Sequence, residues 1–138
     1  MKKSTKIEFN HNRIPRIETI DQFAELLFPG NRNHQKLCLA IFIELKYADN
    51  QFLKSLEWIA EKYGFSNRVL EEVRAKMRRL GLIDHVSRFN AKQGYREGWV
   101  FSNRFWKSAM ILADLPERLR EIKDSKQEAR DRDLFKYL

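Results

Sequence analysis

The side chains best suited to a chemical role lie between Phe65 and Ile83, in the stretch FSNRVLEEVRAKMRRLGLI. Five basic residues occur there, together with Asn67 and the adjacent Glu71 and Glu72. An arginine can donate two parallel hydrogen bonds to a guanine edge or to a phosphate, and an asparagine can bond in a similar way to an adenine edge. This set of side chains therefore favours recognition of a polyanion through charge and hydrogen bonds.

A helix over residues 66–80 must position these side chains. Ser66 suits the N-cap and Gly81 the end of such a helix, and apolar residues recur between them at helical spacing. At about 100° per residue, one stripe is apolar: Leu70, Val73, Met77 and Leu80. The opposite side centres on the small Ala75, and charged residues flank it: Arg68, Glu71, Glu72, Arg78 and Arg79. Asn67 and Arg74 are expected at one edge of that side, and Val69 and Lys76 at the other edge.

Glu71 and Glu72 oppose a polyanion, because a carboxylate close to phosphates raises the electrostatic energy. Two interpretations remain open for them. Either they pair with basic residues three or four positions away on the same helix, or Glu71 accepts a hydrogen bond from a cytosine amino group. We favour the first interpretation, in which the partners are Arg68, Arg74, Lys76 or Arg79.

The positive charge of the chain is concentrated in one region. The formal net charge is +8, and residues 66–107 alone carry ten basic and four acidic side chains. A localised excess of positive charge indicates a polyanionic partner better than a basic composition does.

The segments 82–89 and 98–103 are rich in β-branched and aromatic residues and predict two strands joined by a longer loop. The hairpin carries three basic residues: Arg88, Lys92 and Arg96. Tyr95 and Trp99 could stack on bases, but aromatic residues in a hairpin more often cover a core. The hairpin therefore extends the basic region beyond the helix.

The remaining elements surround this region. Residues 1–17 show no clear period, and we expect an extended arm with one short strand around Ile7–Phe9. Thr19 and Gln22 fit a capping box that begins the first helix. Further helices are expected over a strongly apolar run (34–48), over 53–63, from 104 to near Pro116, and from Pro116 onward. The expected parts are an N-terminal arm (1–17), a central domain (18–107) and a C-terminal helical extension (108–138).

The C-terminal extension contains apolar residues at alternating spacings of three and four, from Leu112 to Ala129, with Lys126 interrupting them. This spacing allows a short heptad seam. A coiled coil, a helix packed against the domain and a solvated tail remain open.

The segment from Leu56 to Val73 resembles a helix-turn-helix and, with the hairpin behind it, the winged-helix DNA-binding family. Ala60 occupies the place where that family has a small residue at a close helix crossing, and Gly64 the place of its turn. Ser66 fits the cap of the following helix. The resemblance covers about half the chain. It implies a mostly α fold with a small β-hairpin wing, extended by N-terminal and C-terminal helices.

The resemblance also implies a function, binding of double-stranded DNA as a transcriptional regulator. The helix 66–80 would lie in the major groove and the wing 88–98 on the backbone or in the minor groove. We expect Arg68 to contact guanine and Asn67 to contact adenine. The expected DNA-binding residues are Asn67, Arg68, Glu71, Arg74, Ala75, Arg78, Arg79, Arg88, Lys92 and Arg96. Homodimers are possible through the terminal helices, 21–27 and 104–138.

Several alternatives share the same pattern. Winged helices also occur in replication or segregation machinery, in RNA binding and as protein–protein interaction modules. We expect no enzymatic activity, cofactor or metal site, because no phosphate-binding glycine loop or catalytic motif occurs and the three histidines are far apart in sequence. The single Cys38 lies in an apolar run and is expected to be buried. No run of residues predicts a membrane span or a signal peptide, so we expect a cytoplasmic protein.

Overall fold

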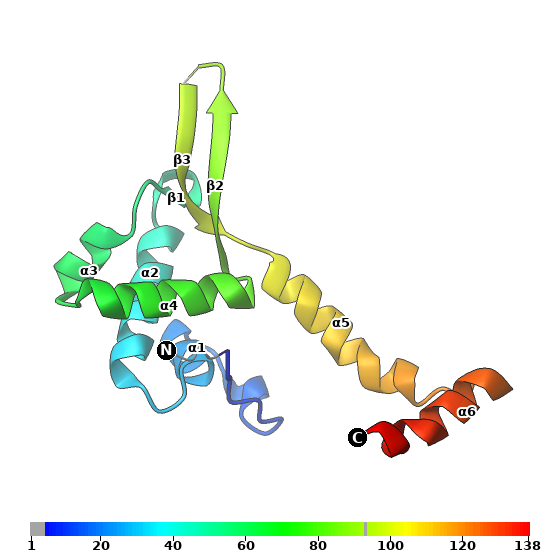
Figure 1. Ribbon diagram of the computed structural model, residues 1–138. Coiled ribbons are helices and arrows are strands. Elements are labelled where there is room, and N and C mark those ends of the chain that lie inside the picture. The colour runs from blue at the N-terminus through cyan, green and yellow to red at the C-terminus, as the bar shows by residue number, and fades with distance from the viewer. Residues whose placement is uncertain (1–4, 93) are drawn as a thin grey trace. The chain divides into compact units, whose positions relative to one another are not determined.

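The computed structural model describes residues 5–92 and 94–138, without the side chains of residues 88–90. The chain divides into two compact units, residues 1–105 and residues 106–138. The fold is mostly helical and has a small antiparallel sheet of three strands, as the sequence predicts at that level (Figure 1). In chain order the first unit contains the 3-10 helix η1 (Ile14–Arg16), α1 (Ile20–Leu27), α2 (Arg32–Lys46), η2 (Asp49–Gln51), β1 (Phe52–Leu53), α3 (Glu57–Tyr63), α4 (Asn67–Leu80), β2 (Ile83–Asn90) and β3 (Gly94–Phe101), and α5 (Arg104–Leu119) begins at its end.

The helix α2 is the centre of the first unit, as its apolar sequence predicts. It contacts α1, α3 and α4, and its inward residues are fully buried: Leu37, Ile41 and Leu45. The predicted apolar stripe of α4 faces this core, because Leu70, Val73 and Met77 are buried, while Leu80 is half-buried. Full burial of such a side chain stabilises a fold by about 1.5–3 kcal/mol. The core therefore fixes which side of α4 faces outward.

The turn between α3 and α4 has the residues that its geometry needs. Gly64 takes a positive φ of 78°, which glycine adopts at little cost, and the Phe65 N–H donates to the Ala60 carbonyl at 2.8 Å. Ala60 is fully buried, so a larger side chain there would not fit. The Ser66 hydroxyl accepts a hydrogen bond from the Val69 N–H at 3.3 Å and caps α4. The predicted tight turn and helix cap are confirmed.

The start of α3 differs from the prediction. The helix expected from residue 53 begins only at Glu57. The reason is a pairing between distant segments, since the two residues of β1 lie opposite Val100 and Trp99 of β3. A helical period in the sequence cannot reveal that pairing, which keeps Phe52 and Leu53 in a strand and delays the start of the helix.

The hairpin is longer than predicted. β3 begins at Gly94 rather than at residue 98, because its outer half pairs with β2 in one continuous register, from Asn90–Gly94 to Ile83–Phe101. The strand order is β1–β3–β2, so β3 is the central strand where β1 is present. We call the β2–β3 hairpin the ribbon. It projects away from the helices of the first unit (Figure 1).

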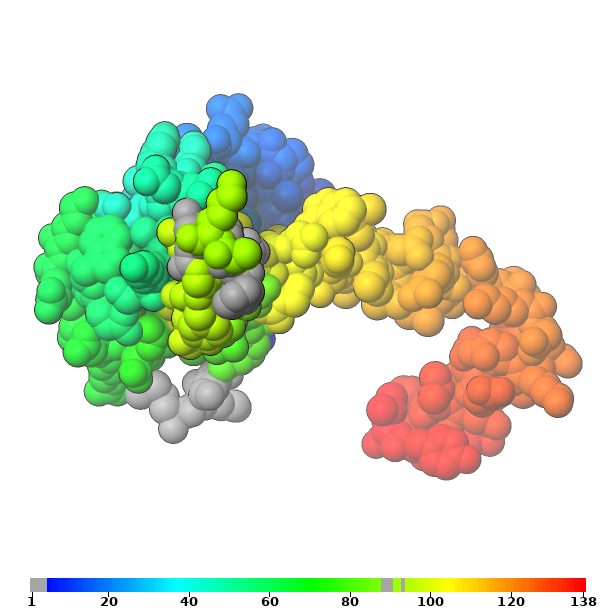
Figure 2. Space-filling view, turned by 90° about the horizontal axis from the view of Figure 1, so that it is seen from above, coloured from blue at the N-terminus to red at the C-terminus, as the bar shows by residue number. Residues whose placement is uncertain are grey.

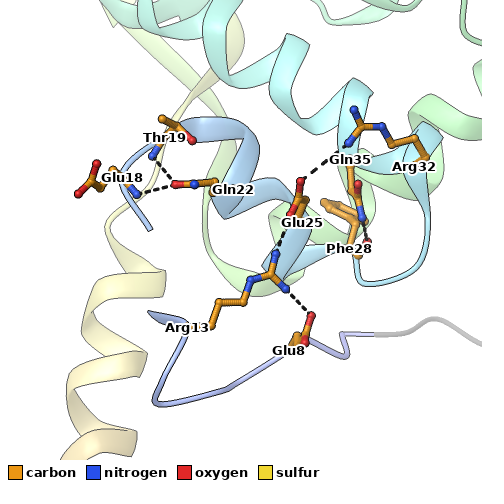
Figure 3. Close-up of polar contacts among 9 residues, drawn as sticks. All are labelled: Glu8, Arg13, Glu18, Thr19, Gln22, Glu25, Phe28, Arg32 and Gln35. Atoms are coloured by element: carbon orange, nitrogen blue, oxygen red, sulfur yellow. Dashed lines mark hydrogen bonds and ion pairs between the residues drawn. The ribbon is translucent and has the colours of Figure 1, made fainter. Parts of the chain in front are cut away.

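The N-terminal arm is attached to α1, and its described residues, 5–17, contain no strand, so the strand expected around Ile7–Phe9 is wrong. The arm meets the end of a helix instead of a strand edge, where the Glu8 N–H donates to the Leu26 carbonyl at 2.9 Å. The Arg13 guanidinium bonds Glu8 and Glu25, each at 2.7 Å (Figure 3). These contacts tie the arm to α1. The capping-box interaction between the Thr19 N–H and the Gln22 side chain is present at 3.2 Å.

Lys76 occupies a different environment from the one predicted. Instead of lying at a solvent-facing edge of α4, it is 9% exposed, and its ammonium donates to the Lys6 carbonyl at 2.7 Å. The ammonium also lies 4.6 Å from the centre of the Phe28 ring. Burial lowers the pKa of Lys76. The arm and the end of α1 cover this part of α4, which the period of α4 alone cannot show.

The second unit consists of most of α5, α6 (Ser125–Asp133) and η3 (Leu134–Tyr137). The helix expected to end near Pro116 continues to Leu119. Proline removes a helical hydrogen bond to the Leu112 carbonyl, and Leu112 is exposed, so water can bond to that carbonyl. Residues 120–124 are not helical, so the apolar seam from Leu112 to Ala129 is interrupted. Within the described part of the chain, no helix is long and apolar enough to cross a membrane.

Candidate nucleic-acid interface

The outward side of α4 carries the side chains that the sequence singled out. Asn67, Arg68, Glu71, Arg78 and Arg79 are exposed, and Ala75 and Arg74 are half-buried. This side lies opposite the buried stripe, as expected from about 100° of rotation per residue. The helix therefore presents a small residue, Ala75, between long charged ones.

A shallow groove runs between α4, the base of the ribbon and the start of α5. We call it the arginine groove. Its lining residues are Glu71, Arg74, Ala75, Arg78, Arg79, Asp84, Trp99 and Arg104. Five of the residues predicted to bind DNA therefore meet in one place. Asp84, Trp99 and Arg104 were absent from that prediction: Trp99 belonged to the predicted hairpin, and residue 104 began the next predicted helix. Their common position depends on how the ribbon crosses α4, which no local sequence pattern encodes.

The acidic residues of α4 are paired, as we favoured from the sequence. Glu72 bonds the Arg68 guanidinium at 3.3 Å through one oxygen and the His34 imidazole of α2 at 3.0 Å through the other. Glu71 lies 3.9 Å from the Arg74 guanidinium. Glu72 therefore joins α4 to α2, and Glu71 remains on the outward side with its side chain 73% exposed.

Arg74 is committed to contacts within the protein. Its guanidinium bonds the Glu57 carboxylate of α3 at 3.0 Å, and only 22% of its side chain is exposed. The pKa of Glu57 is lowered, first by a bond from its own backbone N–H and also by the Arg74 guanidinium. Arg74 thus connects α4 with α3 and is not a freely mobile cation.

Arg104 forms the other end of the groove. Its guanidinium pairs with the Asp84 carboxylate on β2 and also donates to the Arg78 carbonyl at 3.2 Å. Burial acts to raise the pKa of Asp84, but the Ser102 hydroxyl and the Arg104 guanidinium outweigh it and lower that pKa. This pair ties the end of α4, the start of β2 and the start of α5 together.

Arg79 and Arg96 are the contrasting cases. Over residues 5–92 and 94–138, neither side chain forms an ion pair or a side-chain hydrogen bond. Arg79 is exposed at the edge of the groove, and Arg96 is half-buried on β3. Their charges are therefore available to an anion without the loss of an existing bond.

The ribbon carries the rest of the predicted residues. Arg96 is the backbone partner of Arg88 across the hairpin, and the Arg88 side chain lies outside the described part. Lys92 lies beside the hairpin turn and is exposed. Figure 2 looks down on the first unit from the side toward which the ribbon projects. Trp99 is 8% exposed and covers the core, whereas Tyr95 is 64% exposed and does not.

In the part of the chain that the structure describes, the remaining reactive side chains form no second site. Cys38 is buried as expected, and burial raises the pKa of its thiol to about 12, which disfavours the reactive thiolate. His34 contacts Glu72, and His85 lies 3.6 Å from Glu97. Among the described residues, no three histidine, cysteine or acidic side chains are placed to hold a metal ion.

Comparisons with known protein families, curated proteins and solved structures found no significant match to this chain.

Proposed function

We propose that this protein binds double-stranded DNA through α4 and the ribbon, with a winged helix-turn-helix fold. In this proposal the outward side of α4 enters the major groove, and the ribbon follows the adjacent backbone or minor groove. The observation that carries the proposal is the exposed Arg79, which has no ion-pair partner among the described residues and lies beside the small Ala75 in a groove with three more arginines. A helix that approaches base edges needs little bulk at its centre and long donors around it.

The residues of α4 divide by the ease with which they can reach DNA. Arg68 has a side chain that is 75% exposed and one weakly bonded partner on its own helix, so it can turn to a guanine edge. Asn67 is exposed at the start of the same helix. Arg79 suits a phosphate, because its guanidinium can donate two parallel hydrogen bonds to phosphate oxygens without first giving up an ion pair among the described residues. Glu71 would then meet a cytosine amino group or remain with Arg74.

A second copy of the chain is part of the proposal. In α5 several large apolar side chains are more than half exposed, at 56–73%: Trp106, Met110, Ile111, Leu112 and Leu119. Such a surface supports association in water. A two-fold dimer would place two α4 helices on half-sites about one DNA turn apart. We further propose that the protein is a cytoplasmic regulator of transcription.

The test compares two arginine variants by fluorescence anisotropy on a labelled duplex of mixed sequence at low salt. Arg79→Ala should weaken binding by about 5- to 10-fold, the loss expected for one good charged contact. The matched control is Arg16→Ala, an exposed arginine of η1 that removes the same charge elsewhere on the first unit. Equal losses in both variants would mean that only net charge matters, and the proposed face would be wrong.

The same assay separates the alternative partners. Duplex RNA or single-stranded DNA of equal length, added as competitor, should displace the labelled duplex poorly. Stronger competition by RNA would replace the DNA proposal with RNA binding. Absence of binding to every nucleic acid, with α4 folded, would favour the protein-interaction module.

A further inference from the structure

The ribbon is attached to the rest of the first unit only at its base. Trp99 lies on the central strand there and has Leu53 of β1 on one side and His85 of β2 on the other. β1 reaches no further than this position, so the outer ribbon is a two-stranded hairpin. Tyr95, farther out on β3, is already 64% exposed. A free two-stranded hairpin has little stability of its own, so its direction depends on contacts at the base.

Trp99 is also the point at which the ribbon meets α4. Two arginines one turn apart on α4 lie over its indole, with the Arg74 guanidinium carbon at 5.4 Å and that of Arg78 at 5.9 Å from the ring centre. On the ribbon itself, the His85 ring lies 4.9 Å from the indole, tilted by 56°. Guanidinium groups at this distance from an indole face are attracted by its π electrons.

The Arg74 side chain and the Arg78 backbone are in turn bonded to other elements. Arg74 bonds Glu57 of α3 at 3.0 Å, and the Arg78 carbonyl accepts a bond from Arg104 at the start of α5. The indole therefore lies at a junction of α3, α4, α5 and the sheet. In Figure 1, α4 runs below the base of the ribbon, where this junction occurs.

We propose that Arg74 and Arg78 are positioning residues, which fix the direction of the ribbon relative to α4 by stacking on Trp99. This changes the role expected for them from the sequence, where both counted as contacts to DNA. The proposal rests on the proposed function, in which α4 and the ribbon engage one duplex. The helix α4 and the ribbon strengthen each other's binding only when their relative direction lets both contact the same duplex at once.

Lysine distinguishes the two roles of these arginines. A lysine keeps the positive charge and can still contact a phosphate as a point charge. It lacks the planar guanidinium that stacks on an aromatic face and bonds a carboxylate with two donors. Replacement of Arg74 and Arg78 by lysine should therefore preserve a phosphate contact but loosen a stacked junction.

The experiment uses the full chain carrying Arg74→Lys with Arg78→Lys, and Arg16→Lys, an exposed arginine of η1 outside the proposed interface, as the control. The first readout needs no DNA. Hydrogen exchange of the ribbon amides should become about 10-fold faster in the double variant, and exchange in the α2 core should stay unchanged. The control should leave both rates as in the wild type. Unchanged ribbon exchange in the double variant would overturn the proposal.

The second readout is duplex affinity at fixed salt. The double lysine variant should bind about 5- to 30-fold more weakly, and the control should bind nearly as the wild type. Trp99→Phe, which keeps an aromatic face, should retain more affinity than Trp99→Leu. Wild-type affinity in the double variant would show direct phosphate contacts instead. If the wild type binds no duplex while ribbon exchange still responds, the proposed function fails and the positioning role stands.

Discussion

Replacement of Gly81 by alanine should destabilise the first unit more than the same change at Gly64. Both glycines end helices with a positive φ, 83° at Gly81 and 78° at Gly64. A Cβ on Gly81 would lie 2.7 Å from the Phe105 nitrogen and 2.8 Å from the Arg104 Cβ, whereas a Cβ on Gly64 meets nothing within 4 Å. The two positions thus share the same backbone demand and differ in available space.

The magnitudes follow from these two contributions. A non-glycine residue in the left-handed region costs about 1–2 kcal/mol, which applies to both variants. Forced overlap with backbone atoms costs about 1–3 kcal/mol more, which applies to Gly81→Ala alone. We therefore expect a loss of about 1–2 kcal/mol for Gly64→Ala and about 2–5 kcal/mol for Gly81→Ala. The neighbours of Gly81 cannot easily move aside, since its carbonyl accepts a bond from the Phe105 N–H at 2.9 Å.

Urea unfolding followed by circular dichroism measures both losses. With a slope of about 1–3 kcal/mol per molar urea, the extra loss at Gly81 should lower the midpoint by about 1 M relative to Gly64→Ala. Similar midpoints for the two variants would refute the close approach of α5 to the end of α4. A Gly64→Ala variant less stable than Gly81→Ala would refute it more strongly.

Three further changes test other parts of the structure. Ser66→Ala should lower the free energy of unfolding by about 1 kcal/mol in the same urea assay, because it removes the cap of α4; no change would mean that water replaces the cap. Asp84 has a pKa lowered below its ordinary value of 3.8, so its carboxylate stabilises the fold above that pH and the stability is lost as pH falls through the lowered pKa. The urea midpoint of Asp84→Asn should therefore be lower than that of the wild type at pH ~7 and should fall less on acidification, whereas an equal fall would contradict the pairing with Arg104. Leu112→Asp should reduce self-association in sedimentation, because it puts a charge on the exposed apolar surface of α5, and Asp114→Asn is the control on the polar side of the same helix; equal sedimentation of the wild type and Leu112→Asp would argue against a dimer through α5.

The parts of the fold that follow from local signals were predictable from the sequence. The turn at Gly64, the cap at Ser66 and the buried stripe of α4 each depend on residues within one or two helical turns. The same holds for α2, whose apolar run is long enough to indicate a buried helix. The pairing of Glu71 and Glu72 within α4 was also predictable, because partners three and four residues apart share a helix surface.

The parts that depend on distant segments were not predictable. β1 forms because Phe52 and Leu53 meet a strand more than forty residues later, and Lys76 is buried because the N-terminal arm covers it. The same limitation applies to the candidate site. The sequence placed Arg74 among the residues expected to bind DNA and among the possible partners of the glutamates on its own helix. Its contacts with Glu57 and Trp99 lie on other elements. Which arginines are free depends on tertiary contacts.

A salt titration of duplex DNA binding by the wild-type chain tests the central proposal most directly. Neutralisation of DNA phosphates releases counterions, so the logarithm of the affinity should fall linearly with the logarithm of salt concentration between about 50 and 200 mM. Loss of a phosphate contact in Arg79→Ala should make that slope shallower by about one. No binding at about 50 mM salt, or an affinity that does not change with salt, would contradict DNA recognition by α4 and the ribbon.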